Sequence, residues 1–173
     1  DIRVSPIPTD KSLSGMLEAG EIDAVIAPQP PSCFGRGAAG IARLFPDYRE
    51  VEQAYYADTG IFPIMHCVVI RREIYDANRW VARALFKAFA EAKRRAQEQY
   101  FETAALKSML PWLVSHVEDT LAAFGRDWWP YGFAENRATL EVFLRYHHEQ
   151  GLSDRRLDAE ELFAPECLES FKI

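Results

Sequence analysis

The sequence is short of cysteine, of excess positive charge and of long apolar runs, and each shortage excludes a class of protein. Its three cysteines, Cys33, Cys67 and Cys167, are odd in number and far apart, with no CxxC or Cys/His pair at zinc-ligand spacing. They predict reduced thiols. The net charge of −6 argues against a general nucleic-acid surface, although 15 of the 20 cations are Arg and could form a local cationic pocket.

Membrane and export signals are also missing from the sequence. No apolar run approaches the ~20 residues that span a bilayer, and no signal-like segment precedes the first residues. We therefore expect a cytoplasmic protein without membrane contact. The chain opens on "DIRVSPIP" without an initiator Met, so we expect it to be the later part of a longer protein, and whether that protein has a leader stays open.

What is present fits one domain, or one lobe of a larger protein. The 173 residues are 49% apolar, with charges interspersed, which is enough to bury a core. "IRVSPI" at 2–7 alternates like a strand, and "IDAVIA" at 22–27 is a short apolar strand. Between them lies a helix that Ser12 or Asp10 can cap. A third, apolar and β-rich strand is expected at 61–70.

Helices dominate the rest of the pattern. Apolar residues at three-to-four spacing, with breakers at the ends, predict helices at residues 46–60, 79–100, 111–125 and 134–151. The chain closes with two short pieces, "DAEELF" at 158–163 and "APECLESF" at 164–171. Residues 28–45 form the one long loop rich in Pro and Gly. The result is a lopsided α/β domain, whose sheet we expect to be incomplete or completed by further strands.

Several distinctive strings resemble one enzyme family. "GIFPIMH" at 60–66 and "WPYGFAENRATLEVFLRYHHEQGL" at 129–152 are specific, whereas "LEAGEIDA" at 17–24 is shared with many substrate-binding proteins. Together with other pieces, in order along nearly the whole chain, they resemble the C-terminal half of the 4,5-dihydroxyphthalate decarboxylase family. The sequence departs from the family pattern at "DANRW", where Arg79 replaces a usual Pro.

The resemblance implies a type II periplasmic-binding-protein-like fold, in which two α/β lobes hold the ligand in a cleft. Residues 1–62 would be the remainder of the second lobe. Residues 63–173 would be the crossover strand and the helical C-terminal part of the first lobe. The N-terminal half of the same protein would be needed to complete the cleft, and the aromatic content and open sheet are compatible with a homo-oligomer.

The implied reaction removes one carboxylate of 4,5-dihydroxyphthalate to leave protocatechuate, in aromatic catabolism. A ring hydroxyl takes up the electrons if a base accepts its proton, and an acid protonates the ring carbon. No cofactor is obligatory, and the sequence offers no metal motif. His66 is the candidate catalytic residue, since it can accept and donate a proton near neutral pH. The alternative is a core histidine that bonds a backbone carbonyl.

A retained carboxylate needs a cation, and the forked guanidinium of Arg suits it best. Arg43, at the end of the Pro- and Gly-rich loop, is our candidate, with a surface salt bridge as the alternative. Further substrate-binding candidates are Ser32, Cys33, Thr59 and Tyr56. On the competing interpretation, Ser32 and Cys33 only shape the turn, and Thr59 and Tyr56 only pack the end of a helix.

Two functions therefore compete. The first is a decarboxylase acting on a small aromatic acid. The second is a substrate-binding protein of the same fold, which would hold an anionic or aromatic ligand without turnover, and a paralogue with a changed substrate is a third. Fold alone cannot decide between them; a titratable group that faces the ligand favours the enzyme.

Overall fold

The computed structural model describes residues 3–169, which separate into two compact units. The division between the units falls inside a helix, between Glu52 and Gln53. The expected lobe boundary after residue 62 stays a prediction, because it refers to the lobes of a larger protein.

The first unit contains two short helices and long irregular connections. Helix α1 spans Leu13–Glu18, and the Ser12 side chain caps it by accepting a hydrogen bond from the backbone N–H of Gly15, as expected. Helix α2, Ser32–Gly35, packs against α1 and lies inside the loop predicted at 28–45. Helix α3, Tyr48–Thr59, begins in this unit and continues into the second.

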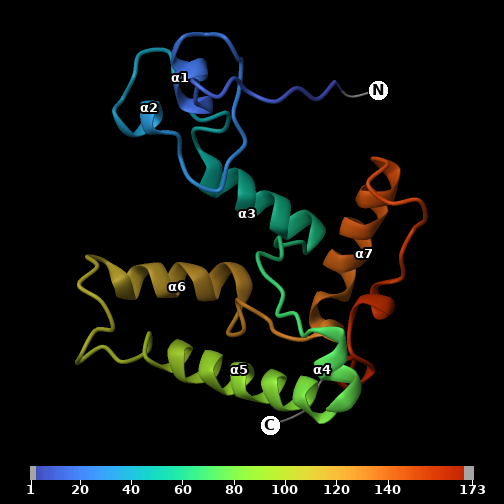
Figure 1. Cartoon of the computed structure of the whole chain (residues 1–173). Helices are drawn as coiled ribbons and strands as arrows, with labels where there is room; N and C mark the ends of the chain where they lie inside the picture. The colour runs from blue at the N-terminus through green and yellow to red at the C-terminus, as the bar shows by residue number, and fades with distance from the viewer. Residues whose placement is uncertain (1–2, 170–173) are drawn as a thin grey trace. The chain divides into compact units, whose positions relative to one another are not determined.

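The second unit is built from longer helices and a C-terminal segment that packs back on them (Figure 1). Helix α5 contacts both α4 and η2, and α7 contacts η1. The C-terminal segment therefore connects α5 to α7, because η2 contacts the first helix and η1 the second. The elements are α4 Arg72–Ala77, α5 Trp80–Glu98, α6 Leu113–Phe124, α7 Phe133–Glu149, and the 3-10 turns η1 Ala159–Leu162 and η2 Pro165–Cys167.

The helix predictions are confirmed. Each predicted helical range holds a helix that starts and stops within a few residues of the expected ends. Gly60 and Gly125 follow α3 and α6 with positive φ angles of 67° and 76°, the conformation in which glycine ends helices. Helices α2 and α4, of four and six residues, were not predicted.

The strand predictions are wrong for the part of the chain that the structure describes. Between residues 3 and 169 there is no strand, so of the expected α/β class only the helices are seen. Residues 61–70 run without regular structure, and Val69 in this segment is 88% exposed. A strand forms only when a neighbour satisfies its backbone N–H and C=O groups. None of the three segments finds such a neighbour here.

The core lies in the second unit, between α7 and the C-terminal segment. Phe133, Leu140 and Leu144 line one side of α7 and bury against Ala159 of η1. Three partly buried side chains complete the cluster: Leu157, Phe163 and Leu168. Their removal from water is the main driving force that holds the segment on the helix.

Candidate functional site

Arg43 lies on the surface of the first unit against two aromatic rings. Its guanidinium carbon is 5.2 Å from the ring centre of Phe34 and 4.7 Å from that of Tyr48. Both distances are within the range of cation–π attraction. Among the described residues, no carboxylate pairs with Arg43. The surface salt bridge considered for Arg43 is therefore not formed, and its N–H groups stay available to an anion.

Ser32 and Cys33 begin α2, directly before Phe34. The Ser32 hydroxyl lies 2.9 Å from the Ser14 hydroxyl and accepts a hydrogen bond from Arg36 at 3.2 Å. Cys33 is fully buried, and its backbone N–H donates to the Ser14 hydroxyl at 3.0 Å. The backbone N–H of Cys33 is therefore used inside the unit, in a hydrogen bond to Ser14 of α1.

Tyr56 and Thr59 lie in the last turns of α3, in the second unit. The Tyr56 ring packs on Phe124 at 4.5 Å between ring centres. The Thr59 hydroxyl donates to the carbonyl of Tyr55 and accepts from the backbone N–H of Ile61. Both side chains thus stabilise the end of the helix, which was the competing interpretation; their binding role stays a prediction.

His66 lies in the irregular segment 61–70, and its imidazole is exposed. Within the described residues, no hydrogen bond or ion pair involves His66. It is therefore not the buried histidine bonded to a carbonyl that was the alternative. The next residue, Cys67, is also exposed.

The structure thus brings together some predicted residues and not others. Ser32, Cys33 and Arg43 belong to the first unit, and Phe34 connects the α2 residues to Arg43. Tyr56, Thr59 and His66 belong to the second unit. Sequence reasoning missed Phe34 and Tyr48. The available signal was an aromatic residue on each side of Arg43, but only folding shows which aromatic side chains touch it.

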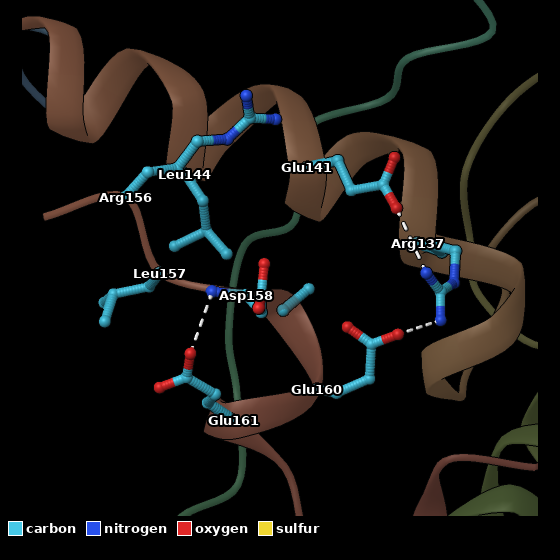
Figure 2. Close-up of a pocket in the computed structure, with 9 residues that line it drawn as sticks. Arg137, Glu141, Leu144, Arg156, Leu157, Asp158, Glu160 and Glu161 are labelled. Atoms are coloured by element: carbon cyan, nitrogen blue, oxygen red, sulfur yellow. Dashed lines mark hydrogen bonds and ion pairs between the residues drawn. The ribbon is translucent and has the colours of Figure 1, made fainter.

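A cavity of about 630 Å³ lies elsewhere, between α7 and residues 156–161 (Figure 2). Arg137 lines the cavity and pairs with Glu141 at 3.2 Å and with Glu160. Hydrogen bonds to these two carboxylates raise the pKa of Arg137. Arg137, Glu141 and Glu160 of the wall are thus paired with one another, and none of the sequence-predicted site residues lines this cavity.

Over residues 3–169, no three His, Cys, Asp or Glu side chains cluster in a way that could hold a metal ion. None of the helices in that range combines the length and the apolar character that crossing a bilayer requires.

Comparison with known proteins decides the family. No family model matches the chain. Over 166 residues, 96% of the chain, it is 40% identical to the 4,5-dihydroxyphthalate decarboxylase of Comamonas testosteroni. The chain belongs to the 4,5-dihydroxyphthalate decarboxylase family. The enzyme of the same name from Pseudomonas putida is 41% identical over 56 residues, which are 32% of the chain and 22% of that protein.

Membership of the 4,5-dihydroxyphthalate decarboxylase family extends over both units of the chain. The match leaves 4% of the chain outside, far less than either unit. The family prediction made from the sequence strings is therefore confirmed. The chain spans about half the length of the Comamonas relative, since the match covers 50% of that protein. We therefore treat the activity of the whole protein as a proposal.

Proposed function

We propose that the chain is part of a cytoplasmic decarboxylase that converts 4,5-dihydroxyphthalate to protocatechuate and CO₂ in aromatic catabolism. The supporting observation is the 40% identity over 96% of the chain to a decarboxylase of that name. The proposal includes the two-lobed, type II periplasmic-binding-protein-like fold. In it, residues 1–62 belong to the second lobe and 63–173 to the first.

His66 is the proposed proton-transfer residue. In the proposed reaction a base takes a proton from a ring hydroxyl, and the imidazolium of His66 protonates the ring carbon that bears the leaving carboxylate. The C–C bond then breaks, CO₂ leaves, and the bond electrons restore the aromatic ring. No oxidant or reductant is consumed. The exposure of His66, without a competing partner in residues 3–169, supports this role, because a donor must reach the substrate.

Arg43 is the proposed anchor for the carboxylate that stays on the ring. Its guanidinium is exposed and unpaired by any described carboxylate, and a forked guanidinium can bind a carboxylate through two hydrogen bonds. The Ser32 hydroxyl is a further proposed contact. Arg36 is a weaker candidate for the same task, since Glu18 already accepts a hydrogen bond from it at 2.8 Å.

The N-terminal half of the protein is the proposed partner that completes the fold. The segment 61–70 is β-rich and apolar, yet Met65 and Val68 are each 64% exposed and its backbone is in no strand. A sheet edge supplied by that half would satisfy the backbone and cover these side chains. Exposed apolar residues of this kind also occur at interfaces between copies of a protein, so a homo-oligomer is a second proposed assembly.

The test uses the full-length protein with 4,5-dihydroxyphthalate and follows CO₂ release. We expect turnover, and we expect His66→Ala to lower kcat by about 10²- to 10⁴-fold, the usual contribution of a positioned acid or base. The matched control is Cys67→Ala at the next exposed position, which should keep wild-type turnover. Wild-type turnover in His66→Ala would remove the role proposed for His66.

A substrate-binding protein is the second candidate, because Arg43 and its aromatic neighbours suit an anionic aromatic ligand whether or not it reacts. Binding of 4,5-dihydroxyphthalate without CO₂ release by the full-length protein would favour this candidate. The 173-residue chain alone should release no CO₂, since half of the proposed cleft is missing and water cannot be kept out.

A further inference from the structure

We propose that Phe34 and Tyr48 are positioning residues that hold the guanidinium of Arg43 ready to bind the carboxylate of an aromatic acid. This inference rests on the anchoring role proposed for Arg43 and extends it to two residues that have no assigned function. Neither ring is proposed to touch the reacting atoms; both act through Arg43.

The two rings come from different helices on either side of Arg43. Phe34 is in α2 and Tyr48 is the first residue of α3. Residue 33, next to Phe34, is fully buried, so the start of α2 is fixed in the unit. A long Arg side chain has many rotamers in water, and contact with two rings reduces their number before a ligand arrives.

No carboxylate among the described residues occupies the N–H groups of Arg43. The guanidinium carbon lies over both rings, and the planar group carries five N–H donors. A carboxylate can therefore bind Arg43 without displacing another anion. An arginine that contacts two rings and binds a carboxylate through two hydrogen bonds cannot be replaced by lysine without loss.

Arg36 lies in the same unit but, unlike Arg43, is already paired with a carboxylate. Its guanidinium donates to the Glu18 carboxylate at 2.8 Å and to the Ser32 hydroxyl at 3.2 Å. An anionic ligand would have to compete with Glu18 for Arg36. For Arg43, two neutral rings take the place of a carboxylate, so the positive charge is held in position without being neutralised.

Phthalate is the probe, because it carries two carboxylates on a ring and lacks the hydroxyls that the reaction needs. Its binding to the full-length protein is measured by titration calorimetry. We expect Phe34→Leu and Tyr48→Leu each to raise Kd roughly 2- to 5-fold, which corresponds to one exposed cation–π contact. Arg43→Gln should raise Kd roughly 10- to 100-fold, as expected for a charge-assisted pair.

Three matched variants separate positioning from structure. Tyr48→Phe keeps the ring and should keep the wild-type Kd. Phe45→Leu removes a 55% exposed ring two residues from Arg43, with no cation contact among the described residues, and should have no effect. Lys11→Gln removes a cation of the same unit that pairs with Glu21, and should likewise leave Kd unchanged.

Kinetics with 4,5-dihydroxyphthalate complete the test. If the rings only position Arg43, the ring-to-leucine variants raise KM while kcat stays near wild type. Unchanged phthalate binding in folded Phe34→Leu and Tyr48→Leu proteins would overturn the inference, and so would a wild type that binds neither phthalate nor 4,5-dihydroxyphthalate. A wild type that binds phthalate through Arg43 and both rings but releases no CO₂ would sink only the decarboxylase proposal.

Discussion

The two units differ in how much apolar surface they bury. In the first unit, Cys33 is the one buried apolar residue that the structure describes, whereas seven lie in the second, around α7 and the starts of α4, α5 and α6. Stability should therefore come mainly from the second unit. The cation proposed to bind the substrate lies in the sparsely packed unit, where contact with Phe34 and Tyr48 positions it without a large buried core.

The largest effect on the free energy of unfolding is expected from a substitution in the core of the second unit, which is the better packed one. Leu144 is buried between α7 and η1, so Leu144→Ala leaves a cavity and should lower the free energy of unfolding by about 2–5 kcal/mol. The measurement is urea unfolding followed by circular dichroism. Ile26→Ala in the first unit is the control and should change it by less than about 0.5 kcal/mol, because Ile26 is fully exposed. Equal losses would contradict the comparison.

A smaller loss is expected from Gly132→Ala at the start of α7. Gly132 has φ of 111°, and an added Cβ would lie 2.7 Å from a carboxylate oxygen of Glu135 and 3.4 Å from the Phe86 ring. The backbone at φ 111° and ψ 159° is essentially restricted to glycine, and this strain should cost about 1–3 kcal/mol, whereas the Glu135 carboxylate is the movable end of a side chain and can shift. Gly40→Ala is the control, since Gly40 has a positive φ of 78° and open space around it. A loss at Gly40 as large as that at Gly132 would show that the backbone and surroundings of Gly132 add nothing to the cost of a positive φ.

The helices of both units could be predicted from sequence because their signals are local. The apolar stripe of α5 and the glycine that ends α6 lie within the elements that they define. Strands could not be predicted in the same way, since "IDAVIA" and 61–70 need a hydrogen-bonded neighbour from elsewhere in the protein. A β-rich composition shows that a segment can pair, but not that a partner is present.

The candidate site was predictable in residue type and not in contacts. Arg43 followed from the chemistry of carboxylate binding and its place in a Pro- and Gly-rich loop. That Phe34 and Tyr48 contact it depends on how α2 and α3 fold around the loop. For Cys33, the competing donor–acceptor pair with Ser14 joins residues 19 positions apart, which no local pattern shows.

A hydrogen bond to Glu166 makes the stability of the second unit depend on pH. The Tyr75 hydroxyl donates to the Glu166 carboxylate at 2.7 Å, joining α4 to η2 in the second unit. This hydrogen bond lowers the pKa of Glu166. Stability from the contact is therefore fully present above the usual carboxyl pKa of 4.5 and is lost as the pH falls through the lowered value. The melting temperature of Tyr75→Phe should lie below that of wild type at neutral pH.

The difference between these two proteins should shrink as the pH falls through the lowered pKa of Glu166, because the carboxyl group is then protonated in both. Tyr55→Phe is the control, because Tyr55 is exposed and its hydroxyl has no hydrogen bond among the described residues. A gap between wild type and Tyr75→Phe that persists unchanged at low pH would mean that Glu166 is not the group that matters.

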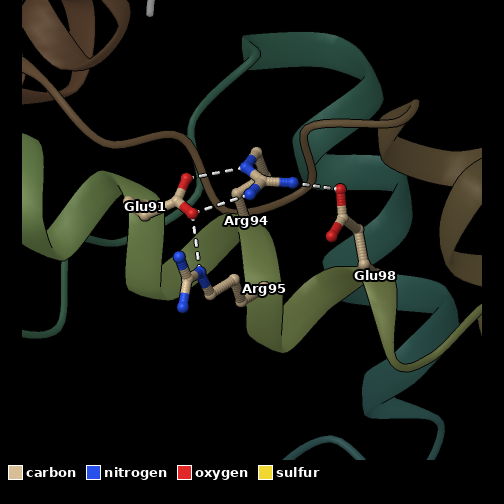
Figure 3. Close-up of polar contacts among 4 residues, drawn as sticks. All are labelled: Glu91, Arg94, Arg95 and Glu98. Carbon is tan, nitrogen blue, oxygen red and sulfur yellow. Dashed lines mark hydrogen bonds and ion pairs between the residues drawn. The ribbon is translucent and has the colours of Figure 1, made fainter.

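The smallest effect on stability is expected for the charged cluster on α5, although its polar contacts are extensive. On α5, Glu91 accepts two hydrogen bonds from Arg94 at 2.7 Å and one from Arg95 at 2.6 Å (Figure 3). The Arg94 and Arg95 hydrogen bonds lower the pKa of Glu91 to about 2. Its contribution is therefore present above 4.5 and disappears as the pH falls toward about 2.

Solvent nevertheless reaches this cluster, because the Glu91 side chain is 33% exposed and the Arg94 side chain 54%. Water and salt screen exposed ion pairs, and fixing long side chains costs entropy. Glu91→Gln should therefore shift the urea midpoint at neutral pH by less than either Leu144→Ala or Gly132→Ala, and 1 M NaCl should reduce even that shift. A salt-independent loss as large as that of Leu144→Ala would show that α5 depends on its charged surface, and that buried apolar area does not account for the difference between the units.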